Sequence, residues 1–348
     1  DGTIQKLVTQ DGPDAHPVWS PDGTRIAFET AMANPDYFYT NGRIAIVSAS
    51  GGVPTVVTSA FDEDVSIVAW RNNGLFFSAA QKTYSYLYRI DPATKAVARL
   101  LPGEGAVGSS FDVSADGGRI AFLNSDAQSM AEVFVAATPA PTNYSATTGF
   151  SRPTKLTDMN AQTASWTTST LEVVSWTSQD GAAIEGVLHK PVDFNPSRKY
   201  PLLVVIHGGP TGVSRAIPFT STIYPIDVWV PRGVLVLEPN YRGSAGYGEK
   251  FRALNVRNLG VGDAWDVLSG VDALIAKGFV DPARVGTMGW SQGGYISAFL
   301  ATHDAARFKA ISVGAGISDW MTYYVNTDIT PFTRQYLKAT PWADPDVY

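Results

Sequence analysis

The stretch Gly289-Trp-Ser-Gln-Gly293 decides the fold of the second half of the chain, because it matches the pattern Gly-x-Ser-x-Gly. Residues 284–288 before it have the pattern of a short strand, and residues 294–301 after it have that of a helix. A serine on a tight turn between a strand and a helix forms a nucleophile elbow, which lifts its hydroxyl group out of the sheet. Glycine is needed at 289 and 293 because side chains would collide across the turn. We predict that Ser291 is a nucleophile; the alternative is a glycine-rich turn without chemistry.

The sequence around this motif predicts strands that alternate with helices. Residues 202–206 and 234–237 are continuous apolar runs, as expected for strands buried on both faces of a parallel sheet. Over 263–277 the apolar residues recur on one helical face, and Gly278 follows as a stop signal. Residues 169–348 are therefore predicted to form an α/β-hydrolase domain with a doubly wound, mostly parallel sheet.

A glycine-rich loop, His207-Gly-Gly-Pro210, follows the apolar run directly. Hydrolases of this fold use such a loop to supply one backbone N–H to the oxyanion hole, and the residue after the nucleophile supplies the other. The candidate donors are Gly209 and Gln292. The position of His207 at a strand end suits a role in shaping the loop better than a role as the catalytic base.

The first half repeats one phrase. Trp19-Ser-Pro-Asp-Gly-Thr-Arg-Ile-Ala-Phe28 returns as Val113-Ser-Ala-Asp-Gly-Gly-Arg-Ile-Ala-Phe122, with a weaker copy at 69–78. Each copy predicts a hairpin with an Asp-Gly or Asn-Gly turn. The turn glycines are 51 and 43 residues apart, which fits the ~40–50 residues of a propeller blade. Residues 1–168 are predicted to be blades of an all-β propeller of the WD40-like type; the alternative is an ordinary meander or sandwich.

The propeller is expected to be incomplete. About three blades are recognisable before residue 165, whereas propellers close with ~4–8 blades. An arc of three blades would leave exposed sheet edges. We therefore expect further blades on the N-terminal side.

Composition and charge argue against several classes of function. Only 17% of the 348 residues are charged and the net charge is −6, which argues against electrostatic binding to nucleic acid or to an anionic membrane. No apolar run approaches the ~18 residues of a membrane span. The chain has no cysteine, and its four histidines form no pair at metal-ligand spacing, so neither a metal nor another cofactor is predicted. The compartment, bacterial cytoplasm or periplasm, stays open.

Three motifs in order carry a resemblance to a known family: His207-Gly-Gly-Pro210, Asn240-Tyr-Arg-Gly-Ser-Ala-Gly-Tyr-Gly248 and Gly289-Trp-Ser-Gln-Gly-Gly-Tyr295. Together they resemble the prolyl oligopeptidase family, in particular its bacterial branch of acylaminoacyl-peptidase-like and dipeptidyl-peptidase-like enzymes. The similarity covers residues 171–348 closely and the propeller loosely. It implies a serine-type exopeptidase that hydrolyses short peptides through an acyl-enzyme on Ser291.

The resemblance also implies a substrate pocket after the elbow. Trp320, Tyr323 and Tyr324 follow the predicted strand 308–313, where the family builds its main specificity pocket. These three are candidate substrate contacts, and ordinary core packing is the alternative. Arg242, in the second motif, is expected to tie loops together and not to bind substrate.

The catalytic acid and base are not found where the family pattern requires them. In this family an acidic residue and then a histidine follow the serine. The only histidine after Ser291 is His303, and it falls on the helix that leaves the elbow. We therefore expect the catalytic Asp and His beyond residue 348, and we expect the chain as given to be an inactive fragment, because a serine without its base is a weak nucleophile.

Two other functions stay open. The elbow and the oxyanion loop would serve an esterase of the same fold equally well. A non-catalytic protein in which the propeller binds a partner is the second alternative, because the repeated phrase also resembles periplasmic propellers associated with translocation. The sequence leaves open whether acyl-peptides, dipeptides or internal bonds are cleaved, and whether the protein forms a homo-oligomer.

Overall fold

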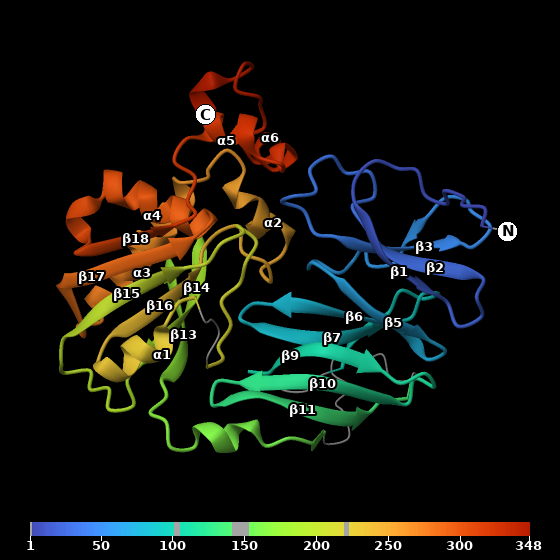
Figure 1. Ribbon diagram of the computed structural model, residues 1–348, viewed down its shortest axis with the longest axis horizontal. Helices are drawn as coiled ribbons and strands as arrows, with labels where there is room; N and C mark the ends of the chain where they lie inside the picture. The colour runs from blue at the N-terminus through green and yellow to red at the C-terminus, as the bar shows by residue number, and fades with distance from the viewer. Residues whose placement is uncertain (1, 101–104, 141–152, 219–222) are drawn as a thin grey trace. The chain divides into compact units, whose positions relative to one another are not determined.

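The computed structural model describes residues 2–100, 105–140, 153–218 and 223–348. The chain divides into two compact units. The first unit comprises residues 1–126 and 131–161, and the second comprises residues 127–130 and 162–348. The first unit contains mainly strands, whereas the second combines one sheet with helices (Figure 1).

The first unit is built from three successive groups of four strands, in which each strand pairs with the one before it (Figure 1). One parallel pairing, between Ser85 and Val107, joins the second group to the third. The strands are β1 (Asp14–Trp19), β2 (Arg25–Thr30), β3 (Arg43–Ser48), β4 (Thr55–Val56), β5 (Ser66–Arg71), β6 (Gly74–Gln81), β7 (Tyr84–Ile90), β8 (Val97–Arg99), β9 (Val107–Val113), β10 (Arg119–Asp126), β11 (Ser129–Ala137) and β12 (Thr154–Lys155).

The repeated phrase of the sequence folds into the same turn twice. In the first copy the Ser20 hydroxyl donates to Asp22 Oδ1 (2.6 Å) and accepts from the backbone N–H of Arg25 (2.9 Å). The copy at 114–119 repeats both bonds at the same distances. The glycine after each aspartate has a left-handed φ, 69° at Gly23, which explains the residue type.

Side chains at the turn of the weaker middle copy form hydrogen bonds with the backbone of the third copy. Arg71 donates from Nε to the carbonyl oxygen of Ser114 and from Nη2 to that of Val113, each at 3.0 Å. Asn73 Nδ2 donates to the carbonyl oxygen of Gly117 at 2.7 Å. The second and third strand groups are therefore linked by side chains as well as by the single strand pairing.

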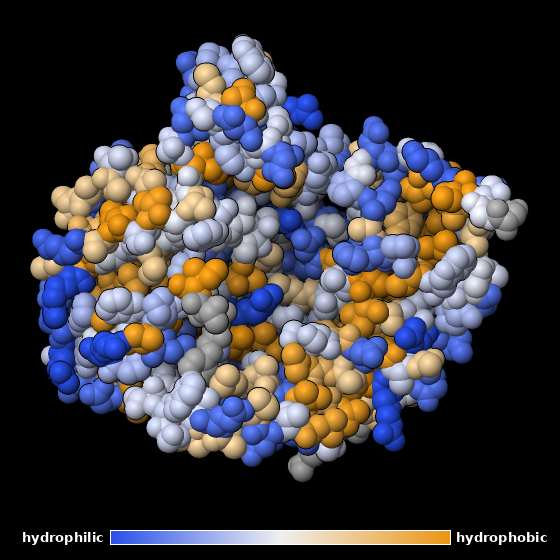
Figure 2. Space-filling view, viewed as in Figure 1, coloured by the Kyte–Doolittle hydropathy of each residue, from blue (hydrophilic) through white to orange (hydrophobic). Residues whose placement is uncertain are grey.

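The core of the first unit lies between these strands. Leu75, Phe76 and Phe77 of β6 are fully buried, as are Leu87 and Ile90 of β7. The apolar side chains of β10 and β11 are less well covered, with Leu123, Val133 and Val135 partly exposed. A hydrophobic area over these strands is visible in Figure 2.

The second unit is a six-stranded mixed sheet in the order β13-β14-β16-β15-β17-β18. The β13–β14 and β14–β16 pairs are antiparallel, and the other three pairs are parallel. The elements are β13 (Thr170–Thr177), β14 (Ala183–Lys190), β15 (Tyr200–Ile206), α1 (Ile226–Trp229), β16 (Leu235–Asn240), α2 (Glu249–Arg252), α3 (Gly262–Ala276), β17 (Val280–Trp290), α4 (Gln292–His303), β18 (Ala310–Gly314), α5 (Trp320–Asn326) and α6 (Thr330–Leu337).

Helices cover both faces of this sheet. Val204 and Ile206 of β15 belong to the large core that also contains residues of α3 and α4, and these two helices contact each other. Val205 points to the opposite face, where it packs with Ile226 of α1 and with Val230. This alternation is the period of a strand that is buried on both sides, as its continuous apolar run predicts.

The predicted helix and strands of the second half are confirmed with small changes in their ends. Helix α3 starts one residue before the predicted position 263, and β17 extends the predicted strand in both directions. None of the described helices is long and apolar enough to span a membrane. Over the same described ranges, no group of three His, Cys, Asp or Glu side chains is placed to hold a metal ion.

Candidate active site

Ser291 occupies the sharp turn between β17 and α4. Its backbone has φ 58° and ψ −119°, a conformation that costs about 1–3 kcal/mol for a residue other than glycine. The backbone N–H of Ser291 donates to the carbonyl oxygen of Gly314 at the end of β18 (3.0 Å), and the N–H of Tyr295 donates to the Ser291 carbonyl oxygen (2.9 Å). The side chain is exposed at the end of the sheet. This is the geometry of a nucleophile elbow.

The glycines around Ser291 are required by close backbone contacts. A Cβ atom on Gly289 would lie 2.3 Å from the carbonyl oxygen of Gly293, and a Cβ atom on Gly293 would lie 2.0 Å from that of Ile206. A Cβ atom on Gly294 would lie 2.1 Å from the carbonyl oxygen of Gly314. Larger residues could not be placed here without moving the backbone.

The glycine loop after β15 runs beside the serine. Residues Ile206 and Gly289 are partners in the parallel β15–β17 pair, so the chain ends of both strands meet at one edge. A Cβ atom on Gly208 would lie 3.8 Å from Ser291 Oγ, which places the loop backbone next to the nucleophile. Gly209 has φ 132° and precedes Pro210 through a cis peptide bond. The two segments that the sequence predicts to form the site are thus adjacent in the structure.

The two predicted oxyanion donors are both available. Gln292 is the first residue of α4, where backbone N–H groups have no partner within the helix. Among the described residues, none accepts a hydrogen bond from the backbone N–H of Gln292 or of Gly209. A helix N-terminus and a free loop N–H are suitable groups for stabilising an oxyanion.

His207 holds this loop in place. Its Nδ1 lies 2.8 Å from the carbonyl oxygen of Gly208, and its Nε2 lies 3.0 Å from Ser244 Oγ. Its ring stacks on Tyr241 at 4.4 Å, and the Tyr241 hydroxyl donates to the His207 carbonyl oxygen (2.9 Å). Burial lowers the pKa of His207 to about 4, so the ring is neutral at pH 7 and Nδ1–H donates to Gly208. This agrees with the predicted role in shaping the loop.

Comparison with known proteins gives a family match for part of the chain. Residues 221–348 match the sequence profile of the prolyl oligopeptidase family. Over this segment the chain is similar to the prolyl oligopeptidase family. The matched segment includes the elbow with Gly289 and Gly293. The glycine loop at residues 207–210 lies before the matched segment.

Relatives extend the similarity to the first unit. Dipeptidyl-peptidase 5 of Porphyromonas gingivalis is 25% identical over 340 residues, which cover 97% of this chain and 47% of that protein. The peptidase YuxL of Bacillus subtilis is 32% identical over 167 residues, or 48% of this chain and 25% of that protein. The chain therefore spans less than half the length of these relatives.

Solved structures show the same fold. The acylaminoacyl peptidase of Pyrococcus horikoshii superposes with a TM-score of 0.74 at 24% identity, covering 91% of this chain and 47% of that one. Dipeptidyl peptidase 4 of Porphyromonas gingivalis gives a TM-score of 0.74 at 21% identity, covering 95% of this chain and 44% of that one. At this level of identity the likeness concerns the fold.

One buried residue of the matched segment could not be identified from the sequence. Asp263, at the start of α3, is 0% exposed, and its Oδ2 accepts a hydrogen bond from Gln292 Nε2 (2.9 Å). Burial raises the pKa of Asp263 to about 7, although the Gln292 amide acts in the opposite direction. The sequence shows only an acidic residue in the first turn of a helix, which is an ordinary surface feature.

Arg242 of the Asn-Tyr-Arg-Gly motif ties three segments together, as predicted. Its guanidinium group is buried and donates to Asp180 (2.7 and 2.9 Å) and to Asp266 (2.7 and 3.0 Å). Asp180 belongs to the turn between β13 and β14, and Asp266 belongs to α3. The side chain is thus occupied by structural contacts.

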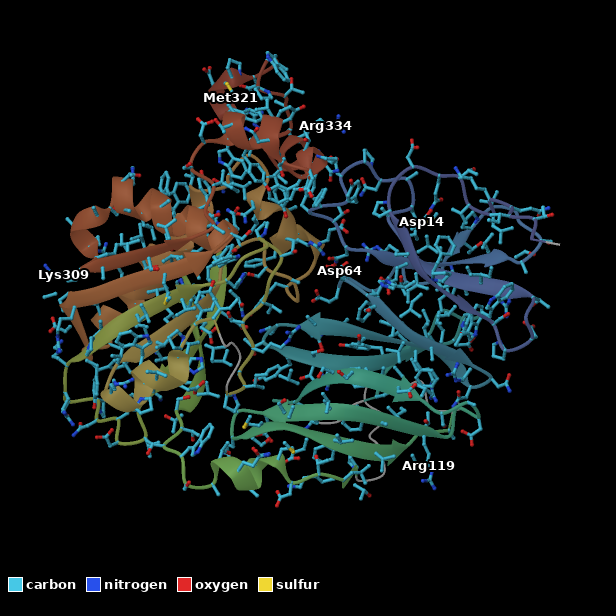
Figure 3. All side chains as sticks on the ribbon, in the orientation of Figure 1. Asp14, Asp64, Arg119, Lys309, Met321 and Arg334 are labelled. Carbon is cyan, nitrogen blue, oxygen red and sulfur yellow. The ribbon has the colours of Figure 1, made fainter. Side chains whose placement is uncertain are left out.

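The three aromatic residues of the predicted pocket do not face one another as a set. Trp320 is buried and makes edge contacts with Tyr295 (5.1 Å) and Tyr323 (5.7 Å). Tyr324 contacts Trp342 instead (5.7 Å) and also Tyr348. Trp320 therefore packs partly as a core residue, next to the elbow helix. Another residue of α5, Met321, projects from its outer side (Figure 3).

His303 does not meet the nucleophile. It lies at the far end of α4, about 18 Å along the helix from Ser291 at 1.5 Å per residue. Its side chain is 68% exposed and stacks on Phe299. Within the described part of the chain, no side chain makes a hydrogen bond with the Ser291 hydroxyl.

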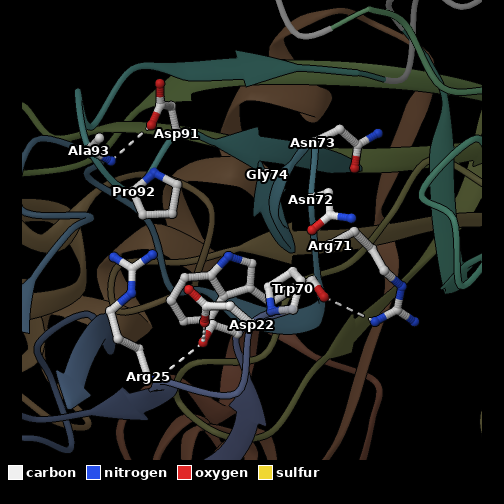
Figure 4. Close-up of a pocket in the computed structure, with 12 residues that line it drawn as sticks. Asp22, Arg25, Trp70, Arg71, Asn72, Asn73, Gly74, Asp91, Pro92 and Ala93 are labelled. Carbon is white, nitrogen blue, oxygen red and sulfur yellow. Dashed lines mark hydrogen bonds between the residues drawn. The ribbon is translucent and has the colours of Figure 1, made fainter. Parts of the chain in front are cut away.

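A large cavity lies elsewhere, in the first unit. It has a volume of about 450 Å³ and is lined by turns of the first two strand groups (Figure 4). Trp70 forms part of its wall, with the Arg25 guanidinium 5.1 Å from the ring centre. Asp91 also lines it, but its Oδ1 accepts a bond from the backbone N–H of Ala93 (2.8 Å). No residue of the elbow lines this cavity.

Proposed function

We propose that the protein is a serine peptidase that hydrolyses short peptides, as an exopeptidase of the acylaminoacyl-peptidase or dipeptidyl-peptidase type. One observation carries this proposal: Ser291, in the strained elbow conformation, lies beside the backbone of the glycine loop, and the N–H groups of Gly209 and Gln292 have no acceptor among the described residues. The names of the relatives, which are peptidases, support the same reaction class.

The proposed reaction is acyl transfer. Ser291 Oγ forms a bond to the scissile carbonyl carbon while a general base takes the hydroxyl proton. The backbone N–H groups of Gly209 and Gln292 hold the negatively charged oxygen of the tetrahedral intermediate. When the carbonyl re-forms, the C–N bond breaks and the amine leaves with the proton. Water then attacks the ester, and the acid product leaves as the Ser291 hydroxyl regains a proton.

The two halves would have different tasks in this enzyme. In the proposal, residues 1–168 are β-propeller blades and residues 169–348 form the α/β-hydrolase domain. The three repeated strand groups, with the same turn in the first and third, support the first assignment. The sheet order of the second unit and its elbow support the second assignment.

Labelling with a fluorophosphonate probe tests the proposal. The probe is applied to this chain and to the full-length product of its gene, with Ser291→Ala as the control. The same proteins are then assayed with an N-acetylated peptide anilide, a dipeptide anilide with a free amine, and a simple aryl ester. Labelling that requires Ser291, together with anilide hydrolysis, is the expected result for the full-length protein.

The other outcomes contradict the proposal in different ways. Hydrolysis of the aryl ester without either anilide would indicate an esterase. Absence of labelling in a folded full-length protein would contradict the assignment of Ser291 as a catalytic nucleophile and favour a binding protein. The choice between the two anilides assigns the dipeptidyl-peptidase or the acylaminoacyl-peptidase type.

A further inference from the structure

Asp263 is a buried acidic group whose role the proposed reaction does not yet include. Its side chain is wholly buried, and a carboxyl group in such a place is costly unless hydrogen bonds compensate for it. Oδ1 accepts from the backbone N–H of Ala264 (2.9 Å), within its own helix. Oδ2 accepts from Gln292 Nε2 (2.9 Å), which crosses from α3 to α4.

Gln292 depends on this single contact. Its side chain is 1% exposed, and the other atom of its amide, Oε1, has no hydrogen-bond partner among the described residues. The bond to Asp263 is therefore the polar interaction that fixes the side chain. Because Gln292 follows directly after Ser291, its side chain and its backbone N–H are attached to the same Cα atom of the elbow.

A second contact joins the same two segments. Tyr295, one turn further along α4, covers Gly260, where a Cβ atom would lie 2.2 Å from the Tyr295 hydroxyl oxygen. The Tyr295 hydroxyl also donates to the carbonyl oxygen of Leu259 (3.4 Å). Residues 259–263 thus contact the first turn of α4 at two points, at positions 292 and 295.

We propose that Asp263 is a positioning residue of the oxyanion hole, which acts by holding the Gln292 side chain so that the Gln292 backbone N–H keeps facing the oxyanion. This inference rests on the proposed function. A permanent negative charge behind an oxyanion donor would oppose the reaction. Burial, which raises the pKa of Asp263 to about 7, reduces that charge near neutral pH. The hydrogen bond survives in both states because the carbonyl oxygen of a protonated carboxyl group still accepts.

The test is a double-mutant cycle in the full-length gene product. Asp263→Ala is expected to slow fluorophosphonate labelling of Ser291 about 10- to 100-fold, less than or equal to the effect of losing an oxyanion donor. The KM for a peptide anilide is expected to stay within about twofold, since the ground state uses the donor little. Asp263→Asn retains an acceptor oxygen and is expected to recover most of the rate. Asp272→Ala, which removes an exposed carboxyl group from the same helix, is the matched control.

The second arm asks whether Asp263 acts through Gln292. Gln292→Met keeps the backbone and the side-chain length but removes the amide. If the inference holds, Asp263→Ala added to Gln292→Met slows labelling no further, whereas independent effects would multiply. Multiplying effects, or unchanged labelling by a folded Asp263→Ala protein, would overturn the inference.

A readout without activity separates this inference from the proposed function. Hydrogen exchange of the Tyr295 backbone N–H, which donates to the Ser291 carbonyl oxygen in the same turn (2.9 Å), is expected to accelerate at least tenfold in Asp263→Ala and not in Asp272→Ala. If wild-type protein is never labelled but this exchange accelerates, the proposed function fails while the ordering role of Asp263 stands. If exchange at Tyr295 is unchanged in a folded Asp263→Ala variant, the inference fails whatever the activity.

Discussion

Arg242 and Asp266 form a buried ion pair in which Nη2 and Nε of the guanidinium group donate to the two carboxylate oxygens at 2.7 and 3.0 Å. The backbone N–H of Arg242 adds a third bond to the same carboxylate (2.7 Å). This pair joins the loop after β16 to α3, the helix that carries Asp263. The loop after β16 is therefore fixed to α3 by three hydrogen bonds to one buried carboxylate.

Removal of the guanidinium group is expected to destabilise the second unit strongly. Arg242→Met leaves the buried Asp266 carboxylate unpaired, which costs about 3–5 kcal/mol of unfolding free energy. Asp180, the other partner of Arg242, is 40% exposed, so Asp180→Ala is expected to cost less than about 1 kcal/mol. Urea unfolding followed by tryptophan fluorescence measures both, and equal losses in the two variants would contradict the assignment.

Glycine at the nucleophile position is expected to relieve backbone strain. Ser291→Gly and Ser291→Ala both remove the hydroxyl group and should abolish fluorophosphonate labelling. Because φ 58° with ψ −119° is strained for any residue with a Cβ atom, the glycine variant should be more stable than the alanine variant by about 1 kcal/mol. Thermal unfolding of the pair measures this difference. A more stable alanine variant would show that the turn is not strained.

Two glycines of β17 should respond differently to the same substitution. A Cβ atom at Gly289 would lie 2.3 Å from the Gly293 carbonyl oxygen, whereas one at Gly286 would lie 3.2 Å from that of Ala310. Gly289→Ala is expected to cost about 3 kcal/mol or more, because the backbone of the elbow must move, and to stop labelling of Ser291. Gly286→Ala should stay within about 1 kcal/mol of the wild type. Soluble yield and the urea midpoint distinguish them.

The stability of the second unit should depend on pH through Asp263. Burial raises its pKa from 3.8 to about 7 in the folded state, so the folded state binds the proton more tightly than the unfolded state. The contribution to unfolding free energy is fully present below pH 4 and is lost as pH rises through 7. Asp263→Asn removes this dependence, so its stability relative to the wild type should rise between pH 5 and pH 8. Urea midpoints at the two pH values test the sign, and a relative decrease would contradict it.

The elbow could be predicted because its backbone demands specific residues. The contacts of Gly289 and Gly293 leave no room for a side chain. The tight turn therefore requires glycine at these positions, and the sequence motif indicates the turn. The loop at Gly208 and Gly209 follows the same logic. Strand and helix positions in the second half were also recoverable, since both sheet faces are buried and the apolar runs are continuous.

Contacts between distant segments could not be predicted in this way. Asp263 and Gln292 are 29 residues apart and meet because α3 and α4 pack on one face of the sheet. Nothing in the local pattern distinguishes a buried acid in a first helical turn from an exposed one. For the same reason, the sequence predicts one pocket for Trp320, Tyr323 and Tyr324. In the structure the ring of Trp320 contacts Tyr323, whereas the ring of Tyr324 contacts Trp342.

The turn of the middle repeat makes contacts that the other two turns do not need. Its Asn-Asn-Gly turn lacks the serine and aspartate that close the other two turns by themselves, and Arg71 and Asn73 reach across to the carbonyl groups of the following copy instead. The middle copy is therefore tied to one particular neighbour. The second and third strand groups are thus not independent units, because the backbone of the third supplies the acceptors for side chains at the turn of the second.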